Sequence, residues 1–112
     1  NTLKIEGEVS SAKLTAGSGA ASRAFFCTKC GTYVYTDYDS AVGRLNVRTK
    51  TLEDPDKFPP QAHIFIKDKD PWLNLSENVN CFEKMYDLKV TWPKESLNRI
   101  KDYLKIKKNK SQ

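Results

Sequence analysis

The chain has 112 residues, of which 38% are hydrophobic and 29% are charged, and its formal net charge is +5. This composition is typical of one small globular domain and argues against a disordered chain. No apolar run approaches the roughly 18 residues that a membrane-spanning helix needs, and no targeting segment is visible, so we expect no membrane partner.

The positive charge is concentrated at the C-terminal end. Residues 93–112 contain seven basic and two acidic side chains, whereas residues 1–92 contain 12 of each. We therefore divide the chain into a neutral body, residues 1–92, and a basic C-terminal helix and tail, residues 93–112. A solvated helix face is the simplest interpretation of the basic segment, and a contact with acidic partners such as nucleic acid is the alternative.

Most of the body predicts β structure, because short runs of alternating apolar, aromatic or β-branched residues are typical of strands. Small and polar residues occupy positions 10–22, with a turn or hairpin loop at 17–19. Prolines at positions 59 and 60 exclude a central strand there, since proline has no N–H for the ladder. The predicted strands cover residues 3–9, 23–26, 33–35, 42–47 and 62–66.

A helix is predicted at the C-terminal end. Pro93 fits its first turn, and Leu97, Ile100 and Leu104 follow at helical spacing. Lysines gather towards its end, where the helix dipole favours positive charge. Residues 73–92 show no clear pattern and stay unassigned.

Cys27 and Cys30 form a CxxC motif, the most informative pattern in the chain. An odd total of three cysteines, two of them in this motif, favours a reducing compartment and therefore a cytoplasmic or nuclear location. The two thiols fit half of a tetrahedral zinc site, a redox pair or two free thiols. Strands flank the motif, whereas a thioredoxin-type pair lies between a strand and a helix. Gly31 supplies the turn that a zinc knuckle needs, so zinc ligation is the favoured interpretation.

Two further residues are weaker candidates for metal ligands. A structural zinc takes four ligands, and the remaining cysteine and histidine of the chain are Cys81 and His63. A lone cysteine is usually a small buried residue, so we expect Cys81 to be buried rather than a ligand. His63 lies in a predicted strand, where a structural histidine is the default and a ligand or general base is the alternative.

An acidic run and an aromatic residue complete the candidates. Glu53, Asp54 and Asp56 favour a solvated turn over a cation site, because aspartate commonly forms turns. Trp72 is expected to be a core or rim aromatic, with substrate stacking as the alternative. Neither the acidic run nor Trp72 is a preferred candidate for a functional site.

Five sequence blocks, spaced over residues 2–75, carry a family resemblance. They are residues 23–32, 51–55, 58–60, 62–65 and 71–73, which read RAFFCTKCGT, TLEDP, FPP, AHIF and PWL. In their order and spacing the chain resembles the glutathione-dependent formaldehyde-activating enzyme family, which also includes centromere protein V.

The resemblance implies a mostly β fold, namely a small zinc-binding β fold like that of the zinc proteins that assist Rab GTPases, followed here by a C-terminal helix. It also implies a zinc-dependent carbon–sulfur lyase that joins formaldehyde to glutathione, giving S-hydroxymethylglutathione. Glutathione or another small thiol adduct is then the expected partner. Residues 1–92 would be a partial domain of this family, and the helix after Pro93 falls outside the resemblance.

The family carries two zinc sites, and this chain matches half of one. The structural zinc takes two cysteines from an N-terminal CxC and two from the later CxxC, which here is Cys27 and Cys30. The catalytic site uses a CxCxxC run that has no counterpart in this sequence, so no catalytic residue is carried over. These departures, with a first residue that is not methionine, predict the C-terminal part of a family member, inactive on its own.

Two other functions stay open beside the truncated enzyme. One is a non-catalytic zinc-binding interaction module. The other is a homodimer in which two chains share one zinc through Cys27 and Cys30, which would supply all four sulfur ligands.

Overall fold

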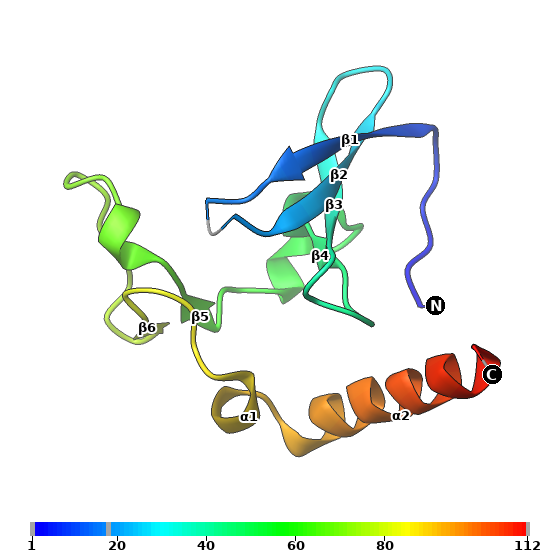
Figure 1. Ribbon diagram of the computed structural model, residues 1–112. Coiled ribbons are helices and arrows are strands. Elements are labelled where there is room, and N and C mark those ends of the chain that lie inside the picture. The colour runs from blue at the N-terminus through cyan, green and yellow to red at the C-terminus, as the bar shows by residue number, and fades with distance from the viewer. Residues whose placement is uncertain (1, 18, 112) are drawn as a thin grey trace.

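A four-stranded antiparallel sheet forms the N-terminal part of the computed structural model, which describes residues 2–17 and 19–111 (Figure 1). The strands pair in chain order, each with the next. The strands are β1 (Val9–Thr15), β2 (Ala21–Cys27), β3 (Tyr33–Tyr38) and β4 (Asn46–Val47).

Short elements and one long helix follow the sheet. The long helix lies at the opposite side of the view from the β2–β3 hairpin (Figure 1), and its start after Pro93 confirms the predicted helix. The prediction of a sheet with a C-terminal helix is therefore confirmed. The elements are η1 (Thr49–Thr51), η2 (Pro55–Lys57), β5 (Ala62–His63), η3 (Ile66–Asp68), β6 (Asn80–Cys81), α1 (Leu88–Thr91) and α2 (Lys94–Lys110).

Small side chains in β2 form the only buried centre of the described residues. Ala24 is 1% exposed and Ser22 is 7% exposed. Ala24 lies opposite Ala12 on β1 and opposite Thr36 on β3. β2 is paired on both edges, so a neighbouring strand about 4.8 Å away covers each side of its backbone, and its small side chains have little surface left to expose.

An aromatic pair joins β2 to β3. Phe25 lies opposite Tyr35, and the two rings stack with their centroids 4.3 Å apart. Such a pair contributes about 0.5–1.5 kcal/mol beyond the area it buries. The strands predicted at 23–26 and 33–35 are confirmed.

The predicted strand at 3–9 is wrong. Residues 2–8 lie outside the strands, and β1 begins at Val9. The apolar alternation is interrupted at Gly7, whose φ of 93° turns the backbone out of the extended region.

The small and polar stretch at 10–22 instead forms most of a hairpin. The N–H of Ala16 donates to the carbonyl of Ala20 at 2.8 Å, which closes the connection between β1 and β2. The turn predicted at 17–19 includes Ser18, which lies outside the described residues.

Two other predicted strands are shorter than expected. The alternation at 42–47 yields only β4, because Gly43 has a φ of 82° within the preceding turn. The alternation at 62–66 yields only β5, because Phe65 adopts a left-handed φ of 53° and a 3-10 helix begins at the next residue. Positive φ is unusual for an aromatic residue, and it ends the extended backbone there.

The described part of the chain is open rather than tightly packed. Its radius of gyration is 16.0 Å, against about 13 Å for a compact domain of roughly this length. Large apolar side chains stay accessible, including Val90 at 82% and Trp72 at 75% exposed. Of the two positions expected for Trp72, core or rim, the core position is therefore excluded. None of the helices formed by the described residues is sufficiently long and apolar to span a membrane.

Candidate functional site

The CxxC motif forms the tip of the β2–β3 hairpin. Cys27 ends β2, and its N–H donates to the carbonyl of Thr32 at 2.9 Å. The N–H of Gly31 donates to the carbonyl of Cys27 at 2.8 Å. Gly31 has a φ of 73°, and a Cβ there would meet no atom within 4 Å, so glycine serves the backbone conformation rather than space. The predicted glycine-dependent turn between two strands is confirmed.

A second set of contacts ties this tip to the segment before β1. The N–H of Thr28 donates to the carbonyl of Glu8 at 3.3 Å, and the Thr28 hydroxyl donates to the same oxygen at 3.4 Å. The turn is therefore held from two sides, by its own hairpin and by the segment that precedes β1.

The two thiols differ in exposure and in hydrogen bonding. Cys27 is half-buried, Cys30 is exposed, and neither forms a disulfide. The Sγ of Cys30 lies 3.2 Å from the Oγ1 of Thr32. Hydrogen bonds from the Thr32 hydroxyl, then from the Thr32 backbone N–H, then from the Cys27 side chain lower the pKa of the Cys30 thiol. A lower pKa favours the thiolate, which is the form that binds a metal.

Thr32 is a further residue of this candidate site, and the sequence motif did not predict it. Its hydroxyl and N–H both support the Cys30 sulfur. The available signal was a hydroxyl residue two positions after the second cysteine, directly beyond the glycine that turns the chain.

The donor set of this turn fits half of a zinc site. Two thiol sulfurs on a well-defined turn are ligands that zinc prefers, but a structural zinc takes four. Among residues 2–17 and 19–111, no three histidine, cysteine, aspartate or glutamate side chains gather closely enough to hold a metal ion. Cys27 and Cys30 therefore do not make a complete site by themselves.

The weaker candidates form a separate pair. The parallel pairing of β5 with β6 sets His63 opposite Cys81. Cys81 is exposed, so the expectation that it is buried is wrong, and its Sγ donates to the carbonyl of Val79 at 3.5 Å. His63 is half-buried. Within the described chain this pair does not join Cys27 and Cys30 in one group, and its role as a ligand stays a prediction.

The acidic run is paired with lysines in a solvated turn. Asp54 lies 2.9 Å from the Nζ of Lys57, and Asp56 lies 3.5 Å from the Nζ of Lys50, with all four side chains mostly exposed. In these contacts the carboxylates form surface ion pairs with lysine side chains. They support the solvated turn that was favoured over a cation site.

One comparison with known proteins, the match to a family's sequence pattern, agrees with the family resemblance. The sequence pattern of the family described as "Glutathione-dependent formaldehyde-activating enzyme" matches residues 1–68, more than half of the chain. This range includes the four-stranded sheet and the CxxC turn, and it excludes α2. No curated protein and no solved structure matches the chain. The chain therefore belongs to the glutathione-dependent formaldehyde-activating enzyme family.

Proposed function

We propose that this chain takes part in the carbon–sulfur lyase chemistry of its family, which joins formaldehyde to the thiol of glutathione. The observation that carries the proposal is the family match over residues 1–68, which contains the complete CxxC turn. In this addition the thiol sulfur bonds to the carbonyl carbon, the C=O π electrons move to oxygen, and the thiol proton ends on that oxygen. The product is S-hydroxymethylglutathione, and no atom of the pair is lost.

Within this function, we assign Cys27 and Cys30 a structural role as two thiolate ligands of a zinc ion. The sheet would then correspond to the zinc-binding β fold of the Rab-assisting zinc proteins. A complete structural zinc contributes an apparent binding free energy of roughly 10–16 kcal/mol. The free energy of unfolding of a whole domain is only about 5–15 kcal/mol. The binding free energy of zinc would therefore be large enough to decide whether the domain folds.

The described residues supply no catalytic metal ligands, so we expect the chain alone not to accelerate the reaction. The support is the lack of any group of three metal-binding side chains among the described residues. The test is the rate of S-hydroxymethylglutathione formation from ¹³C-labelled formaldehyde, followed by NMR exchange spectroscopy with and without the chain. Equal rates are expected. Acceleration by the unaltered chain would contradict this expectation, and acceleration that survives in a Cys27→Ser, Cys30→Ser double variant would also contradict the structural role assigned to the pair.

A second copy of the chain is our proposed source of the missing sulfurs. Cys30 is exposed at the tip of its hairpin, so two tips could meet around one zinc and supply four thiolates. Native mass spectrometry with zinc should then detect a dimer that carries one zinc. A monomer with a tightly bound zinc, or a dimer that persists without metal, would contradict this arrangement.

The basic helix supports a second candidate function, a non-catalytic zinc-binding interaction module. α2 has no buried residue and ends in a run of lysines, including Lys105, Lys107 and Lys108. If these lysines hold a polyanion, changing all three to glutamine should weaken binding to a nucleic acid and reduce the salt dependence. Unchanged affinity and salt slope would remove α2 from this function. A location in the reducing cytoplasm or nucleus is proposed for either function.

A further inference from the structure

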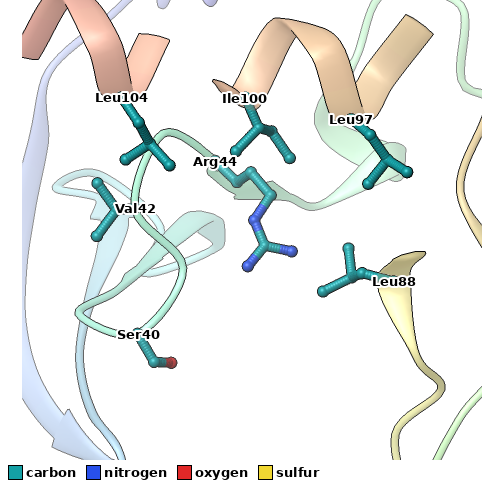
Figure 2. A pocket seen from close by; sticks show the side chains of 7 residues that line it. All are labelled: Ser40, Val42, Arg44, Leu88, Leu97, Ile100 and Leu104. Carbon is teal, nitrogen blue, oxygen red and sulfur yellow. The ribbon is translucent and has the colours of Figure 1, made fainter. Parts of the chain in front are cut away.

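A cavity of about 370 Å³ lies where the loop after β3 meets α1 and α2 (Figure 2). It is open to solvent rather than enclosed, and its volume lies near the lower end of the range of small-molecule sites. Two polar residues, Ser40 and Arg44, contribute to its lining. The rest of the wall is aliphatic and comes from Val42, Leu88, Leu97, Ile100 and Leu104.

The guanidinium of Arg44 points into this cavity. Figure 2 shows the side chain extending from the loop, with its charged end between Ser40 and Leu88. Arg44 lies with its guanidinium carbon 5.5 Å from the centre of the Trp92 ring. The guanidinium therefore lies over the Trp92 ring at a cation–π distance.

This arginine has no anionic partner in the described chain. Its Nε is buried and lacks a hydrogen-bond partner, and no aspartate or glutamate of residues 2–17 or 19–111 forms an ion pair with it. A partly desolvated cation without an anion is unfavourable, because lost hydration is not replaced. The Nε is closed to solvent and therefore to a ligand, so an anion in the cavity would pair with the terminal nitrogens of the guanidinium and balance its charge.

We propose that this cavity binds a small aliphatic monocarboxylate. The planar guanidinium matches a carboxylate, which it holds through parallel N–H···O bonds, and the Ser40 hydroxyl offers a further donor. The aliphatic walls suit a short hydrocarbon chain. A phosphate could also pair with the guanidinium, but it would bring no apolar group for the walls.

The site is independent of the function proposed above. Leu88, Leu97, Ile100 and Leu104 belong to α1 and α2, which lie beyond the family match at residues 1–68. The cavity therefore exists only because the C-terminal helix packs against the loop of the matched part.

The test is a titration of the full chain with octanoate, followed by amide chemical shifts in ¹H–¹⁵N NMR. Octanoate should shift the amide signals of residues 40–44 and of α2. Octanol, which lacks the carboxylate, and acetate, which lacks the long hydrocarbon chain, should each bind at least about tenfold more weakly. Arg44→Gln should weaken octanoate binding about tenfold or more without lowering the melting temperature, since the wild-type cation is unpaired.

Arg48→Gln is the matched control. Arg48 also lies over an aromatic ring, with its guanidinium carbon 5.6 Å from the Tyr33 centroid, but it does not line the cavity. This variant loses the same charge and should bind octanoate like the wild type. Ile100→Trp, which fills the cavity and keeps Arg44, should also weaken binding.

Four results would overturn the proposal. They are no octanoate binding at millimolar concentration, equal binding of octanol, equal losses in the Arg44 and Arg48 variants, and binding of glutathione at Arg44 in preference to octanoate. The last result would join the cavity to the family's substrate site. None of these outcomes depends on whether the chain accelerates the formaldehyde reaction.

Discussion

The β1–β4 sheet and the α2 helix are built on different principles. The sheet contains the two buried residues of the described chain, Ser22 and Ala24, and its strands hold one another by backbone pairing. α2 has no buried residue and meets the rest of the chain through an apolar stripe that includes Leu97 and Ile100. The sheet lies within the family match, whereas α2 lies outside it.

Charge divides the molecule in the same way. The net charge of +5 resides in residues 93–112, and residues 1–92 are neutral. The comparison teaches that the family match and the proposed metal ligands belong to the sheet and its hairpin tip, while α2 adds a basic surface and one wall of a cavity. Changes in the two regions should therefore have different consequences.

The largest effect is expected at the hairpin tip. If two chains share a four-sulfur zinc as proposed above, Cys27→Ser should abolish zinc binding, because a serine hydroxyl does not replace a thiolate. The metal-dependent stabilisation, roughly 10–16 kcal/mol for a complete structural site, should be lost with it. Zinc content by mass spectrometry and thermal unfolding with and without zinc measure this. Cys81→Ser, at an exposed cysteine outside the tip, should retain zinc. Equal zinc content in the Cys27 and Cys81 variants would contradict the role of Cys27 as a zinc ligand.

A buried charge in the sheet should have the next largest effect. Ala24→Asp sets a carboxylate without a partner at a position that is 1% exposed, so we expect a loss of about 3–5 kcal/mol in the free energy of unfolding. Ala12→Asp is the matched control on the neighbouring strand, at an exposed position directly opposite. It should cost about 1 kcal/mol or less. Denaturant unfolding compares the two, and similar losses would mean that Ala24 is not the packed centre.

A smaller effect is expected where the loop touches α2. A Cβ on Gly43 would lie 2.7 Å from Cδ1 of Tyr103, and the residue has a φ of 82°. Gly43→Ala should therefore cost about 1–3 kcal/mol and loosen α2 from the loop. Gly17→Ala, where a Cβ meets nothing within 4 Å, is the control. Hydrogen exchange should be faster in α2 of the Gly43 variant alone, and unchanged exchange would contradict the contact.

The smallest effects are expected for two surface ion pairs, one at η2 within the family match and one in α2. Lys57→Ala removes a 2.9 Å contact with Asp54, and Lys105→Ala removes a 4.0 Å contact with Asp102. Both pairs are mostly exposed, so each loss should be at most about 1 kcal/mol and should shrink in high salt. Chemical denaturation in low and high salt measures this, and a larger loss at Lys57 would give the acidic turn a structural role.

Local chemistry made parts of the fold and site predictable. The CxxC turn followed from Cys27, Cys30 and Gly31, because a knuckle needs two sulfurs and a residue tolerant of positive φ. The start of α2 followed from Pro93 and the helical spacing behind it. The alternation of apolar and polar residues predicted strands at 3–9 and 62–66 that are absent or shorter in the structure. In each segment one residue with a positive φ, Gly7 or Phe65, ends the extended backbone.

The sequence by itself determined the family, the division of charge and the dithiol turn, because each depends on the order and spacing of residues along the chain and not on how segments pack. Only the tertiary structure decided that His63 and Cys81 form a pair apart from the CxxC turn, and that Arg44 faces a cavity without a counter-ion among the described residues. These features depend on strand pairing and on helix packing between segments far apart in sequence. No local pattern specifies them.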